Sequence, residues 1–227
     1  MDSPRIIDSV TGACGELVLR QAGRHYEIIA DGMFLMDTRA GESERLLVRA
    51  AANRMPGPRL LIGGLGVGFS LQEALTLGLT DITVVEREPA VIRWNHQHLG
   101  NPTAARYCIQ ADLVPWLHNT PTLFDAICLD IDNGPDWTLS PDNASLYSPS
   151  GLTLLHSRLT PGGTLAIWSA SASPAFEAAL RAQFTTVETL KTPVPRGEPD
   201  VVFIASSSLQ PSRPSCRPSP QQATQHS

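Results

Sequence analysis

The chain has 227 residues, of which 42% are hydrophobic and 17% are charged, with a formal net charge of −5. This length and hydrophobic content fit one domain of ordinary size and exclude wholesale disorder. No apolar run approaches the length of a spanning helix, and the acidic balance disfavours duplex nucleic acid as a partner. We therefore expect a protein that contacts neither nucleic acid nor membrane.

The first forty residues predict a small β unit. Asp31-Gly32 is a turn signal, and a polar four-residue segment before it separates two strand-like runs. We assign residues 1–40 to this unit, which would lean on the rest of the chain for stability. The strand-like runs cover residues 16–20, 25–30 and 33–36.

From residue 59 onward, apolar strand-like runs alternate with helical stretches. This alternation predicts an α/β sheet that is mostly parallel, with an antiparallel hairpin where the last two strands follow each other without a helix. A turn is predicted at residues 161–163. The predicted strands cover residues 59–62, 81–85, 106–110, 124–129, 164–169, 186–190 and 200–205, and the helices cover residues 70–79, 89–98, 149–159 and 174–183.

Serine and proline dominate residues 206–227. A segment of this composition buries too little apolar surface to offset its ordering entropy, so we predict a disordered tail, with a partner-binding segment as the alternative. The domain between this tail and the N-terminal unit then covers residues 41–205.

The cysteines and the N-terminus indicate the compartment. Cys14, Cys108, Cys128 and Cys216 are far apart, and two of them lie in apolar strand-like runs. The N-terminus also lacks the apolar run of a secretory signal. We therefore predict reduced cysteines in a cytoplasmic protein.

The first strand of the larger domain ends in a glycine-rich turn with glycines at positions 63, 64, 66 and 68. Such a turn lets the backbone approach a ligand, although it can also be only a tight connection between strand and helix. Glu86 ends the next strand, 20 residues after Gly66. A carboxylate there can accept hydrogen bonds from both ribose hydroxyls of a nucleoside, and the alternative is a solvated side chain.

Acids also follow the third and fourth strands. Asp112, which precedes Leu113, can accept a hydrogen bond from the exocyclic amine of adenine, or it can cap the helix that begins at Leu113. Asp130 follows the fourth strand, and Asp132 lies two residues further on. Ligands of open α/β folds bind at this end of the strands, so these residues are candidates for the site.

At this point the chain resembles the spermidine synthases (polyamine aminopropyltransferases), a branch of the class I S-adenosylmethionine-dependent methyltransferase superfamily. The resemblance covers about residues 15–205. It implies a Rossmann-like class I methyltransferase sheet of seven mostly parallel strands with a small N-terminal β-hairpin unit. The similar segments are Asp31-Gly32, the glycine turn at 63–68, Glu86, Asp112, Asp130, and residues 145–147, 159–163 and 195–197. The resemblance implies that Gly63, Gly64, Gly66, Gly68, Glu86, Asp112, Leu113 and Asp130 bind the cofactor.

The departures from the family pattern lie on the acceptor side. Gly66 stands where the family has a loop Asp, Leu35 where it has a glutamine, and Asn133 where it has a second acid. The segment that lines the family's diamine pocket falls near Glu44-Arg45-Leu46. These differences predict a retained nucleoside pocket and a polyamine pocket that is largely lost.

Glycine at position 66 favours intact S-adenosylmethionine, because a fixed acid there would repel its carboxylate while backbone N–H groups and Arg45 would attract it. The leading hypothesis is therefore methyl transfer to a small amine, with no metal. The alternatives are aminopropyl transfer from decarboxylated S-adenosylmethionine to a polyamine, aminocarboxypropyl transfer, and a non-catalytic nucleoside-binding module.

Asp130 is the candidate base for the acceptor amine, and Asp132 is the alternative. Trp137 and Tyr147 either gate the acceptor pocket or only pack a long loop. The family resemblance implies a homodimer.

Overall fold

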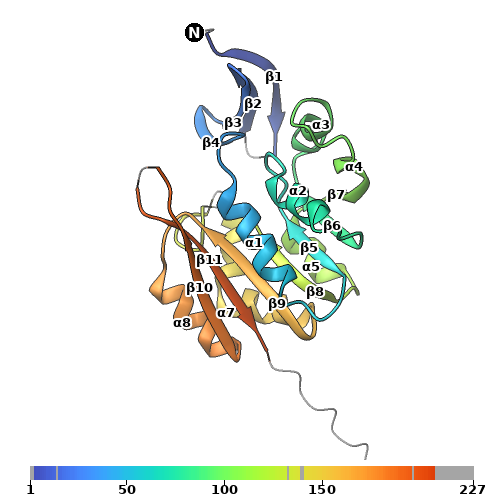
Figure 1. Ribbon diagram of the computed structural model, residues 1–227, viewed down its shortest axis with the longest axis vertical. Coiled ribbons are helices and arrows are strands. Elements are labelled where there is room, and N and C mark those ends of the chain that lie inside the picture. The colour runs from blue at the N-terminus through green and yellow to red at the C-terminus, as the bar shows by residue number, and fades with distance from the viewer. Residues whose placement is uncertain (1–2, 14, 132, 139–140, 196, 208–227) are drawn as a thin grey trace, which may run out of the picture.

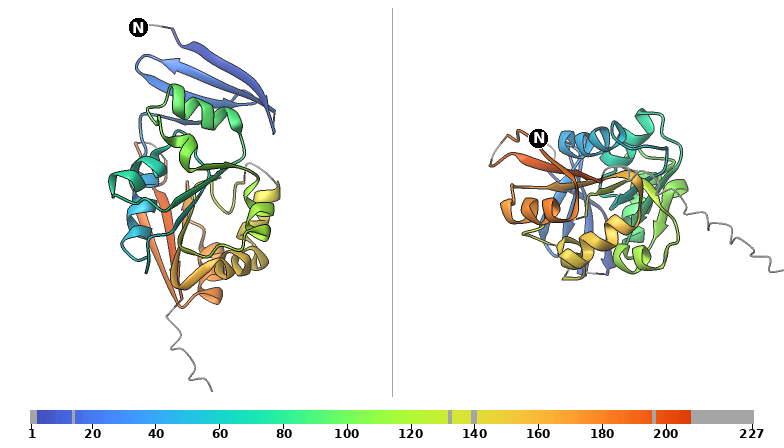
Figure 2. Two further views of the ribbon diagram at one scale, coloured as in Figure 1. Left: turned by 90° about the vertical axis from the view of Figure 1, so that its right-hand side faces the viewer. Right: turned by 90° about the horizontal axis from the view of Figure 1, so that it is seen from below.

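A computed structural model describes residues 3–13, 15–131, 133–138, 141–195 and 197–207. These residues form two β-sheets, one of four strands and one of seven, with helices on both faces of the larger sheet (Figure 1). The smaller, N-terminal sheet sits at one end of the larger domain, as Figure 2 shows from the side. In the described ranges, no helix is both long enough and apolar enough to cross a membrane.

The N-terminal sheet is an antiparallel meander in the order β1-β2-β3-β4. The sequence predicts its last three strands and misses β1, whose register shifts between Ile6 and Asp8. Such a shift breaks the two-residue alternation by which a strand is recognised. The strands are β1 (Arg5–Gly12), β2 (Gly15–Ala22), β3 (His25–Ala30) and β4 (Met33–Asp37).

The larger sheet has the order β10-β11-β9-β8-β5-β6-β7. Its pairs are parallel from β9 to β7, and β11 and β10 are antiparallel, as predicted for the final hairpin. The strands are β5 (Leu60–Gly63), β6 (Ile82–Glu86), β7 (Cys108–Gln110), β8 (Phe124–Leu129), β9 (Leu159–Ser169), β10 (Thr186–Thr192) and β11 (Asp200–Ser206). The predicted α/β class with seven mostly parallel strands is confirmed.

The helices cover the two faces of this sheet with separate apolar clusters. Leu47, Leu71 and Trp94 lie in one cluster, and Leu117 and Leu180 lie in the other. Burial of this apolar surface holds the layers together. The helices are α1 (Glu42–Ala52), α2 (Phe69–Thr76), α3 (Pro89–Gln97), α4 (Ala104–Tyr107), α5 (Leu113–Asn119), α6 (Pro141–Ala144), the 3-10 helix η1 (Ser145–Tyr147), α7 (Pro149–Ser157) and α8 (Pro174–Gln183).

Three local predictions differ from the structure. Helix α1 is not predicted, although its buried side chains recur with helical spacing at Ser43, Leu47, Ala50 and Ala51. The turn predicted at residues 161–163 lies inside strand β9. The third predicted strand shrinks to β7, because α4 takes the residues before it.

The strand order places a switch point at β5. The chain proceeds from β5 to β6 and β7 on one side of the sheet, whereas β8 and β9 lie on the other side. In open α/β sheets, the crevice beyond the carboxyl ends of the strands at this point is the usual ligand site. The domain boundaries 1–40 and 41–205 stay predictions, and from residue 208 the predicted tail lies outside the described residues.

Candidate active site

The glycine turn after β5 approaches the end of β8 closely. Gly64 has a φ of +88°, and a Cβ atom there would lie 2.1 Å from the carbonyl oxygen of Asp130. Only glycine combines that dihedral angle with that contact without strain. The chain enters α2 directly after Gly68, so the first N–H groups of this helix lie next to the turn.

The Glu86 carboxylate braces the same turn. One of its oxygens accepts a hydrogen bond from the backbone N–H of Leu65 at 2.9 Å, and the other accepts one from the N–H of Glu88 at 2.7 Å. The residue is only 9% exposed. Burial raises the pKa of Glu86, while these two N–H groups act in the opposite direction. The solvated alternative for Glu86 is therefore wrong.

Asp112 begins helix α5 without capping it. Its side chain makes no cap hydrogen bond, and its carboxylate lies 3.4 Å from the guanidinium of Arg87. The exposed carboxylate thus stays outside the helix end, which removes the main support for the capping alternative. Leu113 is buried, and a Cβ atom on Gly63 would lie 2.6 Å from its side chain. The Leu113 side chain therefore packs directly against the start of the glycine turn.

These residues line a cavity of about 240 Å³, which we call the strand-end cavity. The larger domain supplies one wall, with Gly64, Glu86, Asp112 and Leu113. Strands β2–β4 of the N-terminal sheet supply the opposite wall. Asp31 lies on that opposite wall and accepts a hydrogen bond from the N–H of Glu16 at 2.7 Å. The cavity also contacts Leu17, Ala30, Met33, Leu35, Val85, Arg87, Glu88, Ala111, Ile131 and Asn143.

Asp130 follows β8 and faces a second cavity. Its Oδ2 atom accepts a hydrogen bond from the Ser70 hydroxyl at 2.8 Å. Burial, and then the negative charge of Glu44, raise the pKa of Asp130 to about 7, against the Ser70 hydrogen bond. A carboxyl group with such a pKa can exchange a proton near neutral pH. The alternative base, Asp132, lies outside the described residues.

The second cavity, which we call the acidic cavity, has a volume of about 310 Å³. The ionisable side chains on its described wall are three acids, Asp37, Glu44 and Asp130. Leu35 and Ile131 line both cavities, so a ligand in one would lie next to a ligand in the other. The rest of its wall consists of Phe34, Met36, Ala40, Asn133 and Trp168.

Helix α1 brings Glu44 to this cavity. The buried Ser43 hydroxyl lies 2.8 Å from a carboxylate oxygen of Glu44 and 2.7 Å from one of Asp200, at the start of β11. One hydroxyl proton can serve only one of two carboxylates, so holding both contacts requires a proton on one acid. Burial raises the pKa of Asp200, while its hydrogen bond with Ser43 acts in the opposite direction. Within the described residues, no group of three or more His, Cys, Asp or Glu side chains could hold a metal ion.

Sequence reasoning underestimated Glu44. The prediction of a largely lost polyamine pocket treated the segment around Glu44 as a departure, yet the side chain lies in the same cavity as Asp130. Had α1 been recognised from its helical spacing, Glu44 would have been placed in its first turn. The cavity beside Asp130 is therefore more acidic than the sequence predicts.

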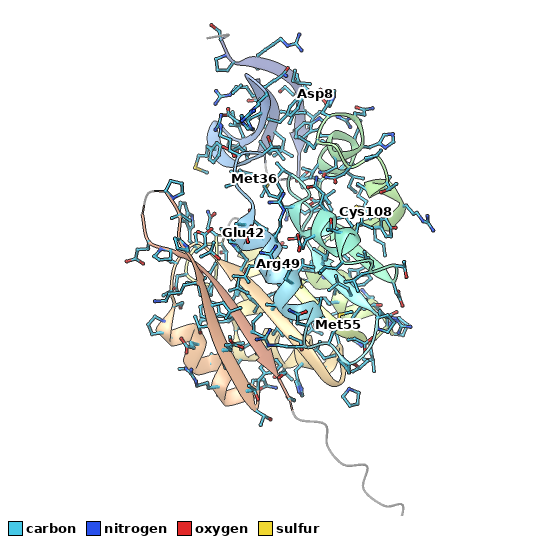
Figure 3. The ribbon with its side chains drawn as sticks, in the orientation of Figure 1. Asp8, Met36, Glu42, Arg49, Met55 and Cys108 are labelled. Atoms are coloured by element: carbon cyan, nitrogen blue, oxygen red, sulfur yellow. The ribbon has the colours of Figure 1, made fainter. Side chains whose placement is uncertain are left out.

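Gly66 and Arg45 have surroundings that the sequence did not reveal. A Cβ atom on Gly66 would lie 2.5 Å from the Met36 sulfur, and Figure 3 shows Met36 at the junction of the N-terminal sheet and α1. The Arg45 guanidinium stacks 4.4 Å from the centre of the Phe69 ring. Arg45 is thus engaged in a cation–π contact, and it is not among the residues that line the strand-end cavity or the acidic cavity.

The two gate candidates differ. Tyr147 is buried and packs edge-on against Phe176, with ring centres 5.6 Å apart, as expected for loop packing. Trp137 is 65% exposed. Its role over the site stays a prediction.

Known proteins resemble this chain in sequence and in structure. No family model matches the sequence. Polyamine aminopropyltransferase 2 of Pseudomonas aeruginosa is 28% identical over 170 residues, which is 66% of this chain and 46% of that protein. The chain thus spans about half the length of this relative.

The structural similarities cover more of the chain. A spermidine synthase in complex with the transition-state analogue AdoDATO superposes over 92% of this chain and 75% of its own, with a TM-score of 0.73 and 17% identity. The spermidine synthase of Thermotoga maritima gives a TM-score of 0.71 over 92% of this chain and 74% of its own, with 15% identity. Human methyltransferase-like protein 13 in complex with SAH gives 0.55 over 77% and 82%, with 21% identity. The predicted resemblance to spermidine synthases and the Rossmann-like methyltransferase fold are confirmed.

Proposed function

We propose that this chain transfers an aminopropyl group from decarboxylated S-adenosylmethionine to an amine. The observation that carries the proposal is the acidic cavity, whose described ionisable side chains are all carboxylic acids and which adjoins the strand-end cavity. The sequence hypothesis of methyl transfer required a place for the carboxylate of intact S-adenosylmethionine. Carboxylates at close range would repel such a group, and the decarboxylated form does not carry it.

The strand-end cavity would hold the nucleoside. The Glu86 oxygens retain lone pairs beyond their two backbone hydrogen bonds and can accept from the ribose hydroxyls. Asp112, in the same cavity, can accept from the adenine amine, and Leu113 offers an apolar surface to the base. Gly64 lines this cavity, so the backbone can approach the ligand there, whereas Gly63, Gly66 and Gly68 pack against Leu113, Met36 and Asn101 and would shape the loop.

The bound cofactor would supply a sulfonium-activated carbon, to which the acceptor nitrogen forms a bond as the carbon–sulfur bond breaks and its electron pair returns to sulfur. The chain would orient the acceptor nitrogen between Asp130 and Glu44 and receive the proton that the nitrogen loses. Asp130, with a pKa raised to about 7, is the proposed proton acceptor, and Asp132 remains the alternative. Ser70 would orient the Asp130 carboxylate through its hydrogen bond.

The experiment that tests the proposal identifies the nucleoside product. The full chain is incubated with candidate amines and with either intact or decarboxylated S-adenosylmethionine, and the products are separated by mass spectrometry. We expect methylthioadenosine and an aminopropylated amine from the decarboxylated form. S-adenosylhomocysteine from the intact form would favour methyl transfer, and calorimetric binding of either cofactor without any product would favour a non-catalytic module.

A further inference from the structure

The wall of the acidic cavity divides into a charged part and an apolar part. Glu44 and Asp130 make up the charged part, where the negative charge of Glu44 raises the pKa of Asp130. The apolar part is larger and comes from strand β4, the end of β8 and strand β9. Its members are Phe34, Leu35, Met36, Ile131 and Trp168.

The third acid of the cavity is already neutralised. One Asp37 oxygen forms an ion pair with the Arg39 guanidinium at 2.6 Å, and the other accepts a hydrogen bond from the Arg39 N–H at 2.7 Å. Arg39 itself continues to Glu27, so the arrangement is a network anchored in the N-terminal sheet. A ligand cation could pair with Asp37 only by displacing Arg39. The displaced guanidinium would then lose its ion pair with Asp37.

Glu44 and Asp130 differ from Asp37 in their partners. Their closest hydrogen-bond donors are the neutral hydroxyls of Ser43 and Ser70. In the described part of the chain, neither acid has an ion-pair partner within 4.0 Å. The cavity therefore offers two uncompensated carboxylates, Glu44 and Asp130, beside a surface that favours methylene or ring carbon atoms.

We propose that the acceptor is a primary amine with a single positive charge and an apolar tail, such as an alkylamine or arylalkylamine, and not a diamine. This inference rests on the proposed aminopropyl transfer and names its substrate class. The ammonium group would lie between Glu44 and Asp130, and the tail would lie along Phe34, Met36 and Trp168. A second ammonium group at the far end of the tail would lose its hydration against apolar side chains without gaining a counter-ion.

A pair of acceptors of equal length tests this directly. Pentylamine and 1,5-diaminopentane differ in one terminal ammonium group, and each is offered with decarboxylated S-adenosylmethionine to the full chain. We expect kcat/KM for pentylamine to exceed that for 1,5-diaminopentane by at least about tenfold, equivalent to roughly 1.4 kcal/mol. Equal values, or a preference for the diamine, would overturn the assignment, including the case in which Asp132 supplies a second anion. Absence of methylthioadenosine with both amines would instead reject the proposed aminopropyl transfer.

A substitution at Phe34 gives a second test that does not threaten the fold. Phe34 is 57% exposed at the cavity wall, so a polar side chain there removes little buried surface. Phe34→Asp would place an anion beside the tail and should raise the ratio of diamine to monoamine kcat/KM by about tenfold. Phe34→Asn, which has nearly the same shape without the charge, should shift that ratio much less. If both variants give the same ratio, the tail does not lie along Phe34 and the assignment fails.

Discussion

The two cavities contain comparable numbers of acids but compensate them differently. In the strand-end cavity, Asp31 and Glu86 accept hydrogen bonds from backbone N–H groups, as does Glu88 from the N–H of Ala13, and Asp112 lies beside Arg87. In the acidic cavity, Asp130 and Glu44 are left with neutral hydroxyl groups and with each other. The first cavity is thus organised before any ligand arrives, while the second holds charge that a cation would relieve.

Because of this difference, the carboxylates of the two cavities are suited to different functions. Carboxylates held by backbone N–H groups or by a guanidinium keep a fixed position, which suits the recognition of ribose and adenine. Asp130, whose pKa is raised, can change its protonation when a cation binds, which suits proton transfer from an amine. Variants of Glu44 and Asp130 should therefore alter turnover, and variants of Glu86 and Asp112 should alter binding.

The largest effect is expected at Asp130. Asp130→Asn keeps the size of the side chain and an oxygen that accepts from Ser70, but it removes the proton acceptor. We expect kcat to fall by about 10²–10⁴-fold, measured as methylthioadenosine formed from decarboxylated S-adenosylmethionine and an amine. Asp132→Asn is the matched control and should leave kcat within a few-fold of the wild type. The reverse pattern would make Asp132 the base, and unchanged turnover in both variants would remove the base from this loop.

Much of the carboxyl edge of the sheet was predictable from the sequence. Gly64, Glu86, Asp112 and Asp130 each follow an apolar run, and parallel strands necessarily bring their carboxyl ends to one edge of the sheet. The structure places all four residues at that edge. Local sequence patterns were sufficient here because the parallel sheet itself brings the ends of these strands together.

The acidic cavity was less predictable, because it depends on contacts between distant segments. Ser43 meets Asp200 across 157 positions, and Met36 reaches Gly66 only because the N-terminal sheet packs over the glycine turn. Side-chain packing of this kind leaves no periodic signal in a single sequence. Helix α1 was missed for a different reason, because its helical spacing was visible in the sequence. Without this helix, Glu44 could not be placed in its first turn.

The next largest effect tests the binding role of the strand-end cavity. Glu86→Gln replaces one acceptor oxygen with an amide NH₂ group, which would face a backbone N–H or a ribose hydroxyl. We expect Kd for methylthioadenosine and for decarboxylated S-adenosylmethionine to rise by about tenfold each, or roughly 1.4 kcal/mol, in calorimetry. Glu88→Gln, two residues away at the same cavity, is the control and should change Kd less than threefold or so. A change confined to one of the two ligands would contradict a shared nucleoside site.

A moderate effect concerns pH. Because the pKa of Asp130 is about 7 in the free protein, the basic form falls from about half at pH 7 to about a tenth at pH 6, so kcat/KM should drop about fivefold. Titration of the amine itself adds to this slope, so two variants isolate the Asp130 contribution. Ser70→Ala removes a hydrogen bond that lowers the pKa and should move the profile to higher pH. Glu44→Gln removes a repelling charge and should move it to lower pH. Shifts in the same direction would show that another group controls the profile.

The last effect is on stability, and it tests whether the folded state disfavours the charged form of Asp130. The pKa of Asp130 is about 7 when folded and about 4 for an ordinary aspartate, so the folded state binds the proton more tightly. Its stabilising contribution is complete below about pH 4 and is lost as the pH rises through about 7. Asp130→Asn resembles the protonated form at every pH. The variant should therefore match the wild type closely at pH 4 and exceed it at pH 8 by up to about 4 kcal/mol, since about three pKa units correspond to roughly 1.4 kcal/mol each.

Thermal unfolding measures this difference, since each 1 kcal/mol shifts Tm by about 2–4 °C in a chain of this size. Asp112→Asn is the appropriate control, because the Asp112 side chain is exposed beside Arg87 and its removal should leave the pH dependence of Tm nearly unchanged. If Asp130→Asn and Asp112→Asn follow the wild-type profile alike between pH 4 and pH 8, Asp130 is not held against its ionisation. The contrast between the compensated and the uncompensated cavity would then be lost.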